Sequence, residues 1–397
     1  MIQSFGIPVE SLHFWLFALA ATLTYRSLTT FKSRNLVLLA LNIYFIVFAI
    51  DNKPSLIALT AFLAVTYGMA VWRFRLGERW RGGGTFAAVF GILFFLFLVR
   101  DQGFLGRSNP FHNSIIRIVG ISYLVFRAIA FFNEYAYLRH RSPVDFLNYM
   151  LFFPALYSGP LARQDSFVQS IETPVALTRD EVLQTSHRIM NGLLKKFVLA
   201  DTLAYSIPNA DAIPTWTPAM LWVGSLLTLL QVYLDFSGYC DISIGIAQLM
   251  GIALPENFDA PFLSRNIQEF WGKWHRTLGL ALRDHVFMPL VRFSYGRFPN
   301  VDRKVVLTSI YGMSLILIGI WHRWSFGFFL YGTLHAAALV LYVLFRRIRG
   351  EAGAVSERVP LDYLSSVLVY SFVSITLTFA LLPNSALLPM FRKMIGV

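Results

Sequence analysis

The chain has 397 residues, of which 56% are hydrophobic and only 14% are charged. Soluble globular domains carry about 25% charged residues, so this composition excludes a soluble globular protein and predicts a membrane protein. The formal net charge of +12 would be typical of a nucleic-acid-binding protein in solution, but on a membrane protein such an excess indicates cytoplasmic loops.

Apolar stretches recur along the whole chain at lengths close to the ~20 residues that a membrane-spanning helix needs. The sequence predicts about a dozen such segments, over residues 11–25, 35–50, 55–72, 85–100, 114–137, 146–160, 188–207, 216–236, 238–254, 305–321, 325–345 and 362–383. The segments at 146–160 and 238–254 contain proline, glycine or aspartate, so one or two segments are expected to be re-entrant. We therefore expect an all-α, polytopic membrane protein with about 11 to 12 membrane segments and no soluble domain.

The basic excess is concentrated in four stretches, residues 26–34, 73–81, 265–304 and 346–349. An even number of predicted segments separates each stretch from the next, so all four can lie on one face of the membrane. The positive-inside rule makes that face cytoplasmic and leaves the N-terminus outside. The stretch 265–304, with eight basic and three acidic residues, could instead bind anionic lipid head groups. In this topology His275 lies on the cytoplasmic side and His322 near the outer face, on opposite approaches to the membrane.

Ionisable residues inside apolar segments are costly and are therefore candidates for function. In this chain they are His322, His335, Asp235 and Asp241, with His275 in the neighbouring polar stretch. An imidazole can take up and return a proton near neutral pH, which acyl transfer to a hydroxyl requires. Each candidate also has a structural interpretation, because a histidine beside a tryptophan can be a hydrogen-bonded core residue and Asp235 can satisfy backbone or tyrosine donors.

Other reaction classes lack their sequence signatures. No short spacing of metal ligands occurs, and the single cysteine, Cys240, excludes a multi-cysteine metal site and an intramolecular disulfide. P-loop, dinucleotide-binding and nucleophile-elbow motifs are also missing from the sequence, so we expect no metal and no tightly bound cofactor. Candidates for an oxyanion donor are Trp321, Tyr239 and the backbone amides near Gly319.

An aromatic and basic block lies at residues 270–276, where Phe270, Trp271 and Trp274 accompany Lys273 and Arg276. This pattern predicts an amphipathic element at the membrane surface, with the rings at the acyl boundary and the cations in water. A groove of this kind could also hold a pantetheine arm or an acidic carrier protein, and the sequence does not separate these roles.

The sequence around the two histidines resembles the signature of the membrane-bound O-acyltransferase family. Residues 319–322 (GIWH) follow residues 270–275 (FWGKWH), and the resemblance covers most of residues 120–340. Further blocks are similar to the bacterial branch of teichoic-acid D-alanyl transferases, at residues 120–127, 152–154, 158–160, 250–252, 255–258, 283–284 and 331–335. Residues 238–242 (GYCDI) are instead similar to the alginate O-acetyltransferases, and Arg323 and Ala281 depart from the D-alanyl pattern.

The resemblance implies one membrane domain over residues 1–397, with N-terminal helices over 1–112, a core over 113–345 and a C-terminal helix over 346–397. The core of the family encloses a funnel and a tunnel. By resemblance His322 is the catalytic histidine at the bottom of a funnel open to the outside, and His275 is a second functional histidine toward the cytoplasmic entrance. Candidates for lining the substrate path are Trp321, Trp274, Asp235, Tyr239, Asp241 and His335.

The same resemblance implies a reaction. An acyl group, D-alanyl in this branch, moves from a cytoplasmic thioester to a hydroxyl of an extracytoplasmic cell-envelope polymer, a polyol or a glycan. The acyl group is bound as a thioester to the phosphopantetheine arm of a small acidic carrier protein. Because opposite charges attract, the candidates for docking this carrier are the basic residues Lys273, Arg276, Arg283 and Arg292. The implied location is the bacterial cytoplasmic membrane, with lipids as partners, room for an extracytoplasmic accessory protein, and no role for nucleic acid.

Three other functions stay open from the sequence. The first is O-acetylation of a polysaccharide of the alginate type. The second is a transporter or flippase, which the intramembrane aspartates and histidines would also suit, although no inverted repeat is evident. The third is a scaffold that has lost its active site, which the departures from the family pattern at Arg323 and Ala281 leave open.

Overall fold

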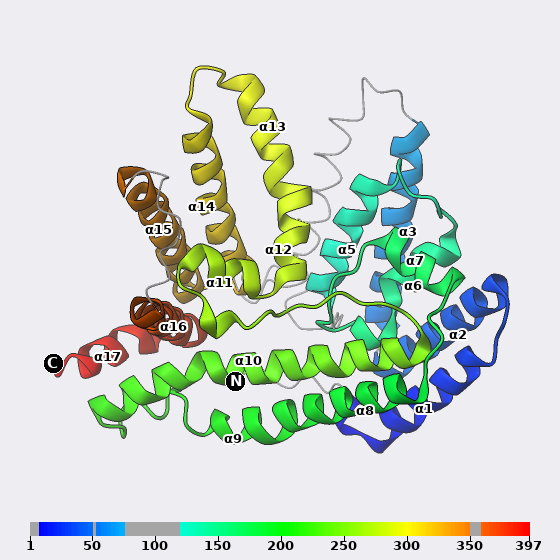
Figure 1. The fold of residues 1–397 in the computed structure, drawn as a ribbon, viewed down its shortest axis with the longest axis horizontal. Helices are drawn as coiled ribbons and strands as arrows, with labels where there is room; N and C mark the ends of the chain where they lie inside the picture. The colour runs from blue at the N-terminus through cyan, green and yellow to red at the C-terminus, as the bar shows by residue number, and fades with distance from the viewer. Residues whose placement is uncertain (1–7, 51–52, 76–119, 350–358) are drawn as a thin grey trace. The chain divides into compact units, whose positions relative to one another are not determined.

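The computed structural model describes residues 8–50, 53–75, 120–349 and 359–397, and all regular structure in these ranges is helical (Figure 1). The chain divides into two compact units, Met1–Asn191 with Tyr239–Pro255 and Gly192–Gly238 with Glu256–Val397. A continuous helical stretch over 179–204 and the long helix α10 both pass from one unit into the other. The single membrane domain over residues 1–397 stays a prediction.

The helices of the two units follow one another along the chain. The first unit holds a 3-10 turn at Pro8–Glu10, α1 (Leu12–Arg26), α2 (Phe31–Ala49), α3 (Lys53–Arg75), α5 (Ile121–Glu134), α6 (Pro143–Leu151), a 3-10 turn at Phe153–Ala155, α7 (Gln164–Glu172) and most of α8 (Arg179–Leu193). The second unit continues with a π-helical turn at Leu194–Ala200, α9 (Asp201–Ala204), most of α10 (Pro218–Met250), a 3-10 turn at Pro261–Leu263, α11 (Ile267–Lys273), α12 (Arg276–Leu282), a π-helical turn at Arg283–Phe287, α13 (Met288–Arg297), α14 (Arg303–His322), α15 (Phe326–Arg349), α16 (Val359–Leu381) and α17 (Asn384–Met394).

Among the described residues, six helices are long and apolar enough to cross a membrane: Phe31–Ala49, Ser55–Arg75, Pro218–Met250, Arg303–His322, Phe326–Ile348 and Tyr363–Leu381. This confirms the predicted all-α, polytopic membrane protein. The predicted segment 85–100 and the first part of 114–137 lie outside the described residues. At the first predicted segment, α1 has 15 residues, which is short for a span.

The predicted segment at 146–160 is not one spanning helix. Helix α6 has nine residues and is followed by the turn Phe153–Ala155. Arg127 of α5, with 3% of its surface exposed, donates hydrogen bonds of 2.7–3.3 Å to the backbone carbonyls of this break, on Tyr149, Met150 and Ala155. Irregular backbone at membrane depth needs such internal partners, so the re-entrant interpretation fits this segment.

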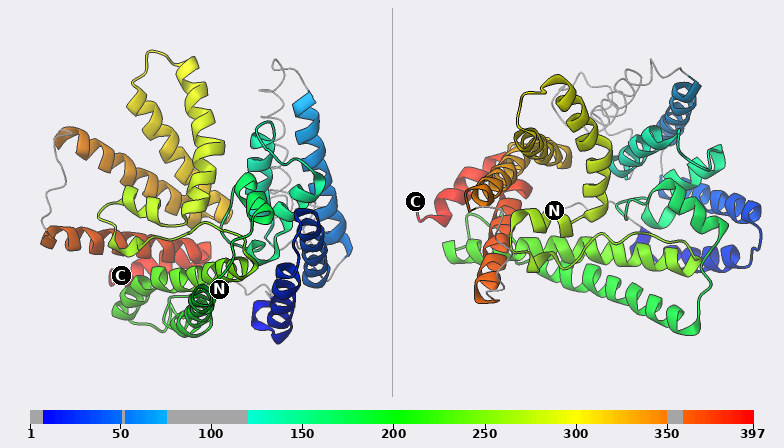
Figure 2. Two further views of the ribbon diagram at one scale, coloured as in Figure 1. Left: turned by 45° about the vertical axis from the view of Figure 1, so that its right-hand side comes forward. Right: turned by 45° about the horizontal axis from the view of Figure 1, so that its top comes forward.

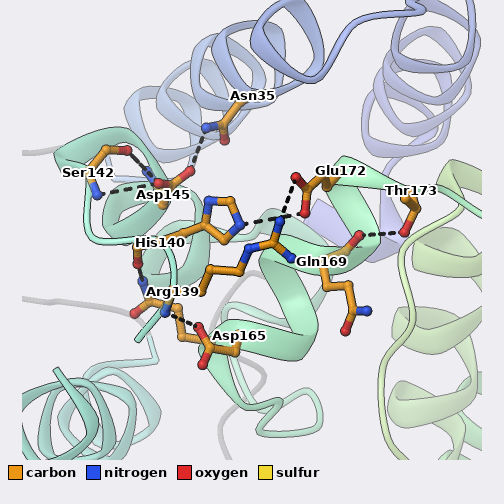
Figure 3. Close-up of polar contacts among 10 residues, drawn as sticks. Asn35, Arg139, His140, Ser142, Asp145, Asp165, Gln169, Glu172 and Thr173 are labelled. Atoms are coloured by element: carbon orange, nitrogen blue, oxygen red, sulfur yellow. Dashed lines mark hydrogen bonds and ion pairs between the residues drawn. The ribbon is translucent and has the colours of Figure 1, made fainter. Parts of the chain in front are cut away.

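Helices α2 and α6 are joined by buried polar side chains. Asn35 donates from Nδ2 to Oδ1 of Asp145 at 2.6 Å (Figure 3), and Asn42 donates in the same way to Asn148 at 3.1 Å. A buried amide without a partner costs more than the net gain of a typical hydrogen bond. These pairs therefore select the faces through which α2 and α6 meet.

The predicted segments 216–236 and 238–254 form one helix instead of two, since α10 runs for 33 residues. The gap between the two predicted segments lies just before Gly238, which has aspartates three residues before and three residues after it. The missing side chain instead lets residues 192–196 come close, because an added Cβ would meet the Gly192 carbonyl oxygen at 2.7 Å and the Lys196 nitrogen at 2.9 Å. Both aspartates have cationic partners, described below, so neither ends the helix.

Helices α14, α15 and α16 share one buried core in the second unit (Figures 1 and 2), which includes Leu315, Phe328, Leu339, Val373 and Leu377. The antiparallel pair α14 and α15 crosses closely at two glycines. An added Cβ at Gly332 would meet the Leu315 carbonyl oxygen at 2.7 Å, and one at Gly319 would overlap the backbone of Phe328. The glycine of the 319–322 block thus holds the end of α14 against α15.

We expect Gly319→Ala to destabilise the second unit by about 1–3 kcal/mol or more, because the new methyl group would push against backbone that cannot rotate away. The matched control is Gly312→Ala on the same face of α14, where an added Cβ would meet the Ala336 side chain at an ordinary 3.6 Å. Thermal unfolding of both variants in detergent measures the difference. Equal unfolding midpoints would show that the close crossing is not required.

Candidate active site

His322 is the last residue of α14, and its side chain is exposed. Its ring lies 4.6 Å from the Trp321 ring and is stacked at 5.7 Å on Phe328, measured between centroids. Arg323 follows in extended conformation and ends the helix. The close crossing at Gly319 therefore sets the position of the histidine one turn later.

His275 lies between α11 and α12 and is 5% exposed. It has the left-handed backbone conformation, with φ of 47°, which residues other than glycine adopt rarely. The loop before α11 holds it there: the Arg276 amide donates to the Asn257 carbonyl at 2.8 Å, and the Thr277 hydroxyl donates to Oδ1 of Asn257 at 2.7 Å. Nδ1 of His275 is 3.2 Å from the same Oδ1.

His275 is a neutral imidazole at physiological pH. Burial, and then the positive charge of His322, lower the pKa of His275 to about 3. The charged form is disfavoured because it would lose water and face a like charge. Such a ring accepts a hydrogen bond at one nitrogen and donates at the other.

A helix pair brings His275 and His322 toward one another, and their placement on opposite approaches to the membrane stays a prediction. Helices α12 and α13, joined by a π-helical turn, form one stretch over 276–297 that runs antiparallel to α14 (Figures 1 and 2). Val291 of α13 packs with Val306 and Ile310 of α14. The start of α12 and the end of α14 therefore meet at the same end of this pair, where the charge of His322 acts on His275.

Aromatic rings surround the buried side of His275. Phe236 of α10 meets the imidazole edge to face at 4.8 Å, and Phe258 lies 5.1 Å from Phe236 and 5.2 Å from Trp274. Trp274 in turn stacks on Phe270 at 5.5 Å. These rings connect the predicted path candidate Trp274 to His275.

His335 is fully buried, and its hydrogen bonds determine which ring nitrogen carries the hydrogen. The Trp271 indole can only donate, so Nδ1 of His335, at 3.3 Å, is the accepting nitrogen. Nε2 lies 3.1 Å from Oγ1 of Thr376, whose own hydrogen goes to the Phe372 carbonyl at 2.8 Å. Both nitrogens are therefore used to join α15 to α11 and α16. The role of His335 in lining a substrate path stays a prediction.

The two aspartates of α10 are paired with cations. Asp235 accepts from Lys196 of the π-helical turn at 2.5 Å, and Asp241 accepts from Arg188 of α8 at 3.1 Å. Asp235 belongs to the second unit with the histidines, whereas Asp241 and Tyr239 belong to the first. Tyr239 donates its hydroxyl hydrogen to the Pro154 carbonyl at 3.1 Å, which leaves it no proton for an oxyanion.

Three of the predicted docking residues in the basic stretch 265–304 have carboxylate partners. Lys273 pairs with Glu269 at 2.8 Å, Arg276 with Asp259 at 3.5 Å and Arg283 with Asp284 at 2.9 Å. Arg292 on α13 is exposed. Among the described residues no group of three or more His, Cys, Asp or Glu side chains could hold a metal ion.

Two residues that contact His275 were not predicted to do so. Asn257 lies in the 255–258 block but was not singled out, because its neighbours Glu256 and Phe258 give no signal that its amide is buried. Phe236 has no sequence signal, because only the fold brings it to His275.

Comparison with known proteins identifies the family. The model of the membrane-bound O-acyltransferase family matches residues 5–359. The teichoic acid D-alanyltransferase of Bacillus subtilis is 34% identical over 274 residues, which are 66% of this chain and 68% of that protein. A probable alginate O-acetylase of Pseudomonas putida is 30% identical over 70% of this chain and 61% of its own length. The teichoic acid D-alanyltransferase of Streptococcus thermophilus is 33% identical over 57% of each chain.

These matches confirm the resemblance seen in the sequence, to D-alanyl transferases and alginate O-acetylases alike. They cover the helices that carry both histidines and their surrounding rings. The protein is a multi-pass membrane acyltransferase, and the chain belongs to the membrane-bound O-acyltransferase family.

Proposed function

We propose that this chain moves an acyl group, D-alanyl in first place, from a carrier-protein thioester on the cytoplasmic side to a hydroxyl of a cell-envelope polymer. The observation that carries the proposal is the convergence of His275 and His322 at one end of the α13 and α14 pair. The similarity to two teichoic acid D-alanyltransferases supports the acyl group. In this proposal the protein lies in a bacterial cytoplasmic membrane with its N-terminus outside.

His322 acts as the general base. It takes the proton from the acceptor hydroxyl as that oxygen attacks the thioester carbonyl, and it returns the proton to the sulfur when the carbon–sulfur bond breaks. One ester and one free thiol result, and no proton is gained or lost overall. His322 suits this role because it is exposed to an incoming substrate and imidazole exchanges protons near neutral pH.

His275 stays neutral throughout, because a buried ring beside another histidine resists protonation. It accepts a hydrogen bond from the acceptor hydroxyl or the leaving thiol and so orients it. Holding the two reactants in line contributes more to the rate than the base alone, since effective molarities for oriented groups are very large.

Alginate-type O-acetylation is the second candidate. It is favoured by the similarity to alginate O-acetylases and by residues 238–242 (GYCDI). Both candidates share the histidine chemistry and differ in the acyl group and the acceptor.

The decisive experiment supplies membranes containing the chain with two labelled donors, a D-alanyl carrier-protein thioester and an acetyl thioester. We expect an alkali-labile D-alanyl ester to appear on the envelope polymer, as measured by mass spectrometry. An acetyl ester alone would support the second candidate. Passage of an unmodified solute with no ester formed would contradict both and support a transporter.

A further inference from the structure

Asn257 forms hydrogen bonds with both backbone and side-chain atoms of the turn that carries His275. Its backbone carbonyl accepts from the Arg276 amide at 2.8 Å. Its side-chain Oδ1 lies 3.3 Å from the Thr277 amide nitrogen, 2.7 Å from the Thr277 hydroxyl and 3.2 Å from Nδ1 of His275. With 1% of its surface exposed, Asn257 holds three consecutive residues of a turn that has left-handed backbone at its first position.

These contacts determine which imidazole nitrogen carries the hydrogen. The Thr277 amide can only donate, so the atom of Asn257 that faces it is the oxygen and not the amide nitrogen. That oxygen can only accept, so Nδ1 of His275 must be the protonated nitrogen. Nε2 is then the nitrogen with the lone pair.

The groups that face the ring come from three parts of the second unit. Phe236 covers one side from α10, the Asn257 amide faces it from the loop, and the titratable group acting on it from α14 is His322. A neutral amide at this position keeps the ring neutral, whereas a carboxylate would favour the imidazolium.

We propose that Asn257 is a positioning residue for acyl transfer, which fixes the Nδ1-protonated tautomer of His275 and so presents its Nε2 lone pair to the reacting hydroxyl or thiol. This inference rests on the proposed function, because it assigns His275 a part in the reaction. It concerns a residue that acts through His275 and does not itself touch the substrate.

The test replaces Asn257 by aspartate, which keeps the accepting oxygen but adds a negative charge. We expect the pKa of His275 to rise by about 1 to 3 pH units, so that ester formation declines at a higher pH than in the wild type. The protonated ring has no lone pair, and the loss therefore begins on the acidic side. The pH profile of D-alanyl transfer and a nitrogen-15 NMR titration of histidine-labelled protein in detergent measure the two effects.

Thr277→Val is the matched control, since it removes a hydrogen bond to the same oxygen without adding charge. Its pH profile should coincide with that of the wild type. His275→Ala assigns the NMR signal and separates the two proposals. Full activity of His275→Ala would contradict the proposed function at this residue.

Two results would overturn the inference while leaving the proposed function intact. One is an Nε2-protonated His275 in the wild-type spectrum. The other is an unchanged His275 titration and pH profile in Asn257→Asp, with His275→Ala inactive. Because the NMR titration does not depend on turnover, the wild-type spectrum decides the tautomer even if a variant is inactive.

Discussion

Replacing His322 by alanine is expected to lower the rate of ester formation by ~10² to 10⁴-fold, the usual contribution of a general base. The exposed side chain makes ring contacts with Trp321 and Phe328 but lies outside the buried core of the second unit. Its removal should therefore leave folding nearly unchanged. The rate of labelled acyl transfer in membranes, divided by the amount of protein in the membrane, measures the effect.

His187→Ala is the control, because this histidine of α8 is also exposed but lies in the first unit. It should transfer the acyl group at the wild-type rate. If His322→Ala kept that rate at a normal protein level, the assignment of the base would be wrong and the convergence of the two histidines would need another explanation.

The sequence predicted the class of fold because membrane burial leaves a direct signal in composition. Long apolar stretches at 31–49 and 303–322 became helices at nearly the predicted positions. Breaks in the helices were harder to predict, since the partners that stabilise or remove a break are distant in the chain. A gap was predicted between segments 216–236 and 238–254, but α10 continues through it, and residues 192–196 lie close to Gly238. Arg127 supports a real break at Phe153–Ala155 from another helix.

In the candidate site, too, features encoded by neighbouring residues were predicted, whereas contacts between distant residues were not. His275 and His322 were found from their motifs and from the cost of ionisable groups near the membrane. Their placement relative to the membrane stays a prediction, and the sequence did not show that residues 276–297 form a helix that packs antiparallel to α14. The charge of 265–304 was counted correctly, but the sequence did not show how it is paired: Lys273 and Arg283 have carboxylate partners four residues and one residue away. Its role as a docking surface stays a prediction.

The pair formed by Asp235 and Lys196 should be the most sensitive ionic contact in the second unit. Their side chains are 25% and 15% exposed, and α10 is one of the helices that can cross the membrane. We expect Asp235→Asn to destabilise the protein by about 3–5 kcal/mol, because it leaves the Lys196 ammonium group without its carboxylate in a poorly hydrated place. Unfolding in detergent, followed by circular dichroism, measures the loss.

Two further variants separate charge pairing from general damage. Asp235→Leu combined with Lys196→Met should recover most of the lost stability, because replacing a buried ion pair by apolar side chains is often neutral. Glu172→Gln weakens the pair with Arg139, whose side chain is 72% exposed (Figure 3), and should cost less than about 1 kcal/mol. Equal losses in Asp235→Asn and Glu172→Gln would mean that water reaches both pairs alike. In that case Asp235 would not be needed for stability, and its position in an apolar segment would favour the predicted role in lining the substrate path.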